Sequence, residues 1–223
     1  MKTIILSLGG SLICPDKVDV NFLTRFVSCV SDFVSLGNRI VIVCGGGRIA
    51  REYMNSVDES VSDEDKDWIG IAATKLNAEL VRVMFGSLAF DKVISNPSEK
   101  IKTNKNVIIA CGFEPGCSTD KDAVLLAKNF KAPYVINMSN VEYVYDKDPS
   151  KFKDAKKIET MSWDKMISIV GKEWKAGLNM PFDPIASTLA KKNGLSVFII
   201  GKDLLNFKKV LDGSNFNGTV IRL

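Results

Sequence analysis

The chain has 223 residues, of which 46% are hydrophobic, enough to bury the core of one large or two small domains. Its 30 Lys and Arg against 26 Asp and Glu give a formal charge of +4, spread without a basic block, which argues against a nucleic acid polymer or a membrane as partner and favours a small anionic ligand. Because the sequence contains no His, a Ser-His-Asp triad, a His metal ligand and a His general base are excluded.

The first predicted element is a buried strand over Thr3–Leu8, which ends at Gly9-Gly10. Two glycines at the carboxyl end of a strand let a ligand approach the backbone, although an ordinary tight turn uses the same residues. Apolar residues at helical spacing then predict a covering helix over 20–36 that stops at Gly37.

A second strand, Arg39–Cys44, runs directly into three glycines (45–47) and a helix that carries Arg48 and Arg51. Amides at a helix start beside guanidinium groups are typical of phosphate binding. The spacing matches neither a Walker A loop nor the dinucleotide-binding G-x-G-x-x-G motif. We favour phosphate contact over a flexible connector because another glycine-rich loop repeats the arrangement.

A polar loop over 56–66 precedes a long apolar-rich helix predicted over 67–85. Asp67 lies at the predicted start, where it is either a helix cap or an acceptor for the hydroxyl groups of a ligand. A short strand is predicted around 92–95, followed by a polar connector.

The ten residues 111–120 (CGFEPGCSTD) join a β-branched strand over 106–110 to a helix over 119–130. Two glycines, one proline and then Ser118 and Thr119 at the helix start offer amides and hydroxyls that can hold an anion. The loop by itself is equally compatible with a simple capped turn.

A strand over 132–138 ends in the segment 139–149, whose aromatic, acidic and Lys side chains suit a purine and a metal-bound triphosphate. The alternative is a turn closed by Asp148-Pro149. Asp183 and Pro184 are typical of a helix start. The remaining predicted elements are helices over 162–170, 185–192 and 203–211 and strands over 196–200 and 219–221.

Strands and helices alternate, which predicts an α/β protein: a three-layer α/β/α sandwich with a mostly parallel central sheet. All glycine-rich loops then lie at one carboxyl edge of the sheet. A change of composition near Lys131 indicates two lobes of a single domain, 1–223, rather than separable domains. The five cysteines, an odd number without a CxxC pair, favour reduced thiols, and no apolar run approaches a membrane span, so we expect a soluble, cytoplasmic protein.

Seven short motifs follow one another along nearly the whole chain. They are LGGS (8–11), GGGRIAR (45–51), DWIGIAATKLNA (67–78), GFEPGCSTD (112–120), SNVEYVYDKDP (139–149), FDPIAS (182–187) and NGTVI (217–221). Each is weak alone, but in this order they resemble the amino acid kinase family, and within it the archaeal-type uridylate kinases.

The resemblance implies the carbamate kinase-like fold and direct transfer of the γ-phosphoryl group of ATP to UMP. Mg2+ would accompany ATP, with no protein side chain assigned as its ligand. The lobe over about 1–130 would bind the acceptor and the lobe over about 131–223 would bind ATP. A homohexamer, a trimer of dimers, is also implied. A chain without His can perform this reaction, which requires mainly alignment and charge compensation.

The resemblance assigns roles to individual residues. Asp120 would organise the reacting centre, with catalytic roles for Gly9, Gly10, Arg48 and Arg51. The residues expected to bind UMP are Gly45, Asp67, Gly112, Phe113, Glu114, Pro115, Gly116, Cys117, Ser118 and Thr119. Those expected to bind ATP are Gly9, Gly10, Gly46, Arg51, Ser139, Asn140, Tyr145, Lys147 and Asp148.

Three positions depart from the family pattern. Ser7 stands where many members have Lys, a loss that archaeal-type members share, and we assign the transition-state cation to Arg48 instead. Glu142-Tyr143 replaces an Asp-Gly pair beside the nucleotide, which bears on the choice of donor. Phe113-Glu114 replaces a smaller or more polar pair and bears on the choice of acceptor.

Two alternatives keep the fold and change the function. One is a kinase with a different acceptor, for which the lack of a catalytic His disfavours isopentenyl phosphate, and the PGCST loop suits a phosphate better than an α-amino acid. The other is a non-catalytic sensor or storage protein that binds a nucleotide or an oxyanion. Ser7 and Tyr143 are the residues that prompt this second alternative.

Overall fold

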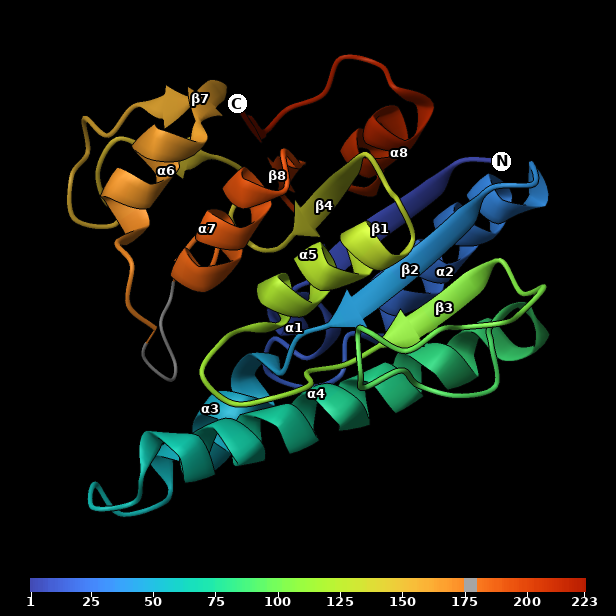
Figure 1. The fold of residues 1–223 in the computed structure, drawn as a ribbon, viewed down its shortest axis with the longest axis horizontal. Helices are drawn as coiled ribbons and strands as arrows, with labels where there is room; N and C mark the ends of the chain where they lie inside the picture. The colour runs from blue at the N-terminus through green and yellow to red at the C-terminus, as the bar shows by residue number, and fades with distance from the viewer. Residues whose placement is uncertain (175–179) are drawn as a thin grey trace.

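The computed structural model of the chain describes residues 1–174 and 180–223 (Figure 1). Its central seven-stranded sheet has the order β3-β2-β1-β4-β8-β9-β7. The five strands from β3 to β8 are mutually parallel, whereas β9 is antiparallel to β8 and parallel to β7. The strands are β1 (Thr3–Leu8), β2 (Arg39–Cys44), β3 (Val107–Ala110), β4 (Tyr134–Met138), β7 (Thr160–Ser162), β8 (Ser196–Ile200) and β9 (Thr219–Arg222).

Helices cover both faces of this sheet, which confirms the predicted three-layer α/β/α sandwich (Figure 1). One face carries α2 (Val20–Ser35), α4 (Asp63–Phe85) and α8 (Leu204–Asp212). The other carries α5 (Thr119–Asn129), α6 (Trp163–Val170) and α7 (Pro184–Lys192). Short helices α1 (Gly10–Ile13) and α3 (Gly47–Asn55) follow the first two strands, η1 (Gly86–Leu88) follows α4, and β5 (Val144–Tyr145) pairs with β6 (Lys157–Ile158).

Alternation along the strands divides the apolar side chains between two cores. On β1, Ile4, Leu6 and Leu8 enter the core under α2 and α4, while Ile5 enters the core under α5 and α7. Strands of a parallel sheet are buried on both faces, so a continuous apolar run such as TIILSL is what their sequence requires. Within the described residues, no helix combines the length and apolar character needed to cross a membrane.

Two local predictions are wrong. Helix α4 begins at Asp63 rather than at 67, because the Ser62 hydroxyl caps it by accepting from the amide of Asp65. Acidic residues in its first turn also favour this earlier start, through the helix dipole. Asp67 is therefore a buried residue inside the helix and not its cap. The strand expected around 92–95 is reduced to a single bridge between Ile94 and Ala110.

The loops that follow β1 and β2 meet backbone to backbone. A Cβ atom on Gly10 would overlap the backbone nitrogen of Gly47 and the carbonyl oxygen of Gly45. Gly47 itself has a φ of +65°, a conformation that favours glycine. The glycines thus bring two loops together at the carboxyl edge of the sheet, where the amides of Gly9 and Gly45 already donate to the carbonyls of Met138 and Leu8.

Replacing Gly10 with Ala is expected to destabilise the protein, because the new methyl group must displace backbone rather than a flexible side chain. Such overpacking costs about 1–3 kcal/mol or more, a fall in Tm of roughly 2–10 °C for a chain of this size. Calorimetry would measure it. Gly70→Ala is the control, since its Cβ meets only the Met54 sulfur at 3.4 Å within a helix. A Gly10→Ala protein that melts with the wild type would contradict this account.

Candidate active site

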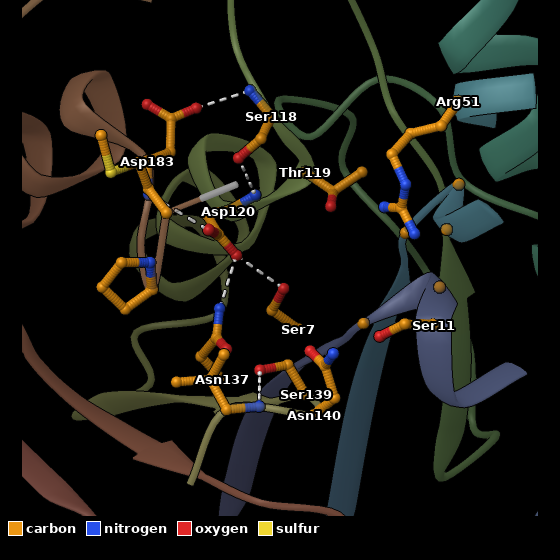
Figure 2. Close-up of a pocket in the computed structure, with 18 of the residues that line it drawn as sticks. Ser7, Ser11, Arg51, Ser118, Thr119, Asp120, Asn137, Ser139, Asn140 and Asp183 are labelled. Carbon is orange, nitrogen blue, oxygen red and sulfur yellow. Dashed lines mark hydrogen bonds between the residues drawn. The ribbon is translucent and has the colours of Figure 1, made fainter. Parts of the chain in front are cut away.

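A cavity of about 390 Å3 lies at the carboxyl edge of the sheet (Figure 2). It is called the main cavity below. The loops after β1, β2 and β4 line it, together with the start of α5 and the start of α7. The predicted convergence of the glycine-rich loops on one edge is confirmed, since Gly9, Gly10 and the three glycines 45–47 all line this cavity.

Asp120, in the first turn of α5, accepts hydrogen bonds from three other elements (Figure 2). Its Oδ1 accepts from the Ser7 hydroxyl and from the Asn137 side-chain amide, both at 2.8 Å. Its Oδ2 accepts from the backbone N–H of Asp183 at 3.3 Å. We call these four residues the Asp120 network. Burial of the carboxyl group, and secondly the charge of Asp183, raise the pKa of Asp120 to about 6.

Asp183 joins the start of α7 to the start of α5. Its Oδ1 caps α7 by accepting from the amides of Ile185 and Ala186, as the Asp-Pro sequence predicts. Its Oδ2 accepts from the amide of Ser118 at 2.5 Å. The Ser118 amide is therefore already bonded, and the Ser118 hydroxyl accepts from the Asp120 amide. What Ser118 can offer a ligand is its hydroxyl hydrogen.

The two arginines of α3 have different surroundings. Arg51 lines the main cavity, with its guanidinium group between Thr119 and Ser11 (Figure 2). Arg48 instead pairs with Asp16 and with Glu52 on the surface and does not line this cavity. The structure therefore favours Arg51 over Arg48 as the cation that faces a bound phosphate. Sequence reasoning could not separate the two, because both follow the same glycines.

A side cavity of about 190 Å3 adjoins the main one. The two share Arg51, Ser118, Thr119, Trp174 and two of the glycines after β2. The walls of the side cavity come from α3, α4, the loop 112–118 and α5. Among the predicted acceptor residues it is lined by Asp67, Gly112, Glu114, Cys117, Ser118 and Thr119, whereas Gly45 lines the main cavity and Phe113, Pro115 and Gly116 line neither of the two.

Helix α4 holds two glycine-rich loops in place through three polar side chains: Asp67 and Thr74 bind the loop 112–118, and Asn77 binds the loop after β2. The Asp67 carboxylate accepts from the amide of Gly116 at 2.7 Å and from the Trp174 indole N–H at 3.2 Å. The Thr74 hydroxyl accepts from the amide of Gly112 at 2.9 Å. Asn77, buried one turn further along, donates to the carbonyl of Gly45 at 2.8 Å. One helix thus positions both glycine-rich loops.

Only part of the predicted ATP set lies at these cavities. Ser139 and Asn140 line the main cavity, and the Ser139 hydroxyl accepts from the Val141 amide. Tyr145, Lys147 and Asp148 line neither cavity. Tyr145 is in β5, Lys147 pairs with Asp154 at 2.6 Å, and the Asp148 carboxylate accepts from Ser150.

Sequence reasoning missed several residues of the site, among them Thr74, Asn77, Asp122, Asn137 and Trp174. Asn137 had a signal, since it is a polar residue inside the otherwise apolar strand YVINM. Asp122 also had one, because it precedes the buried Leu126 by four residues and so shares the buried face of α5. Trp174 had none. Among the described residues, no three His, Cys, Asp or Glu side chains are grouped to hold a metal ion.

Glycine-rich loops, helix N-termini and one arginine converge at the carboxyl edge of a parallel sheet, which defines a phosphate-binding α/β protein. The model of the amino acid kinase family matches residues 2–201, and the chain belongs to this family.

Two relatives by sequence are named uridylate kinase. The one from Pyrococcus abyssi is 35% identical over 97% of this chain and 98% of its own length. The one from Methanobrevibacter smithii is 34% identical over 98% of both chains.

Solved structures of uridylate kinases are also similar to this chain. The uridylate kinase from Archaeoglobus fulgidus is 33% identical, covers 99% of this chain and 100% of its own, and superposes with a TM-score of 0.84. The UMP kinase from Bacillus anthracis covers 99% of this chain and 96% of its own, with a TM-score of 0.77. Because its sequence identity is only 19%, this similarity supports the fold and nothing further.

Replacing Ser7 with Ala is expected to raise the pKa of Asp120 further, because the ionised carboxylate loses one of the hydrogen bonds that favour it. Carbon-13 NMR of labelled Asp carboxyl groups would follow the titration, with the signal assigned from Asp120→Asn. Ser11→Ala is the control, since it removes a hydroxyl from the same cavity that is not among the donors to Asp120. An unchanged midpoint in Ser7→Ala would refute the role given to this bond.

Proposed function

We propose that the chain is a uridylate kinase, which transfers the γ-phosphoryl group of ATP to UMP to give UDP and ADP. The observation that carries the proposal is the meeting of two cavities at Arg51: one polar and lined by the glycine-rich loops after β1 and β2, the other flanked by α4. The names of the sequence relatives support the same activity. The main cavity would hold the reacting phosphates, and the side cavity the nucleoside of UMP.

The chemistry needs no general base. The attacking group is an oxygen of the UMP phosphate, which is already ionised near neutral pH because the second pKa of a phosphate monoester is about 6. The protein must therefore bring two anions into line and compensate their charge. A site without His, built from amides, hydroxyls and one guanidinium group, fits this requirement.

Asp120 would act by holding other groups and not by moving a proton. Both carboxylate oxygens already accept from the protein, so the residue fixes β1, β4 and α7 around the phosphates. Arg51 would supply the charge that stabilises the equatorial oxygens of the transferred group. Ser7, in place of a lysine, adds no charge there, which leaves this task to Arg51.

The donor would lie on the other side of the main cavity, against Ser139 and Asn140. Its adenosine would extend toward Tyr145, Lys147 and Asp148, so that residues 1–130 bind mainly the acceptor and 131–223 mainly ATP. Mg2+ would be held by the oxygens of ATP and would neutralise part of their charge. The acidic groups of the main cavity, Asp120 and Asp183, already accept from protein donors. A cytoplasmic homohexamer, a trimer of dimers, completes the proposal.

A coupled assay with ATP and Mg2+ tests the activity, with UMP, CMP, dTMP and AMP offered as acceptors. We expect turnover with UMP and slower turnover with AMP, because the bicyclic base of AMP is larger than the single ring that the side cavity is proposed to hold. Turnover with another monophosphate but not with UMP would overturn the substrate. If ATP binds and no acceptor reacts, the protein is a nucleotide-binding sensor instead.

Arg51→Ala is expected to lower kcat by at least tenfold, since it removes the guanidinium group beside the transferred phosphoryl group. Arg48→Ala is a matched control on the same helix, because Arg48 is paired on the surface with Asp16 and Glu52. We expect it to change kcat less than about threefold, as surface pairs contribute little. The same coupled assay measures both variants. Equal losses in the two would contradict the placement of the cation.

A further inference from the structure

Asp122 is a buried carboxyl group that the proposed mechanism does not use. It lies in α5, two residues after Asp120, and only 2% of its surface is exposed. Its Oδ2 accepts from the amide of Phe113 at 3.3 Å. Its Oδ1 is buried and has no hydrogen-bond partner among the described residues. The same residue lines the side cavity.

The hydrogen bond to the Phe113 amide does not by itself explain why a carboxyl group is buried at position 122. A single oxygen suffices to accept from the Phe113 amide, and leaving a buried polar atom without a partner is destabilising. Burial is also the main reason why the pKa of Asp122 is raised to about 7. An unpaired, deeply buried carboxyl oxygen at the wall of a cavity is best explained by a partner that arrives with the ligand.

The charges around Asp122 come from every wall of the side cavity. Lys121, on the same helix α5, lowers the pKa of Asp122. Glu114 of the loop 112–118 and Asp183 at the start of α7 raise it. Asp67 of α4 and Arg51 of α3 line the same cavity. Lys121 also pairs with Glu114 at 2.8 Å, which offsets part of its effect. Among the described residues no cation is bonded to Oδ1, and with a pKa raised to about 7 both protonation states of Asp122 are accessible near neutral pH.

The ligand that fits this wall is a flat ring with a polar edge. Ile71 and Met54 line the side cavity with apolar atoms, and Gly70 and Gly112 line it without side chains. A Cβ on Gly112 would approach the Thr74 hydroxyl to 3.2 Å, so the loop already lies close to α4. If UMP is the acceptor, as proposed above, its ring occupies this space and presents its polar edge to one of the walls.

We propose that Asp122 recognises the pyrimidine base of the acceptor, with its free Oδ1 bonded to the exocyclic group at ring position 4. Uracil carries a carbonyl oxygen there, and cytosine carries an amino group. Since Oδ2 accepts from the Phe113 amide, the proton of neutral Asp122 is on Oδ1, where it donates to the uracil carbonyl. Ionised Asp122 only accepts, which favours the cytosine amino group and repels the uracil carbonyl.

The inference rests on the proposed function, and the pH dependence of base preference tests it in the wild-type enzyme. We expect the ratio of kcat/KM for UMP to that for CMP to fall between pH 6 and pH 8 by up to roughly a hundredfold, because the ratio of neutral to ionised Asp122 falls from about 10 to about 0.1 around a pKa of about 7. Ionisation of the substrate phosphate and of Asp120 cancels in this ratio because it affects both acceptors. A ratio that is constant or rises with pH would overturn the role of Asp122.

Asp122→Asn gives an independent test. Its amide oxygen can still accept from Phe113 while its NH2 group donates to the uracil carbonyl at every pH, so we expect a ratio that favours UMP and does not vary with pH. Asp164→Asn, an exposed carboxyl group on α6, should keep the wild-type profile. If Asp122 only supports the loop, both acceptors lose activity equally and the pH dependence is unchanged.

The same assay separates the two proposals. Turnover of UMP with a ratio that does not depend on pH, in the wild type and in Asp122→Asn alike, would overturn only the role of Asp122. Failure of both UMP and CMP to react in the wild type would overturn the proposed function, and this inference with it.

Discussion

The Asp120 carboxylate is the interaction on which the rest of the site depends. Ser7 comes from β1, Asn137 from β4 and the Asp183 amide from the start of α7, and all three donate to one side chain on α5. Four elements that are distant in sequence are thereby fixed at the carboxyl edge of the sheet. Ser7 provides a hydrogen bond without a charge, so the negative charge of ionised Asp120 is not offset here as it would be by a lysine.

The glycines supply a second constraint, which is steric. Gly10 and Gly47 lie in direct backbone contact, so the loops after β1 and β2 form one continuous backbone surface. Asn77 of α4 holds this surface from below through the carbonyl of Gly45. Together with Arg51 the surface separates the main cavity from the side cavity, and this division allows two phosphorylated ligands to meet end to end.

Much of the fold could be predicted because its information is local. Apolar runs followed by glycine predict the central parallel strands and their order along the chain. Asp183-Pro184 predicts a helix start that the structure confirms. The start of α4 lies earlier than predicted, because the polar stretch before 67 contains Ser62, whose side chain caps the helix. The strands β5, β6 and β7 have only two or three residues, too few to show a period.

Site residues could be predicted only where they belong to a recognisable sequence motif. The glycines, Asp67, Asp120 and Arg51 come together as expected. The pairing of Arg48 with Asp16 depends on contacts that a sequence does not display, and so do the hydrogen bond from Trp174 to Asp67 and the unpaired oxygen of Asp122. These are long-range consequences of packing.

An acceptor and a donor nucleotide are proposed to meet at Arg51, each in its own cavity. A crystal structure with UMP and a non-hydrolysable ATP analogue measures this directly. We expect the UMP ring in the side cavity, with its phosphate and the γ-phosphate of the analogue on either side of Arg51. A UMP ring bound against Ser139 and Asn140, with the side cavity left without a nucleotide, would contradict it.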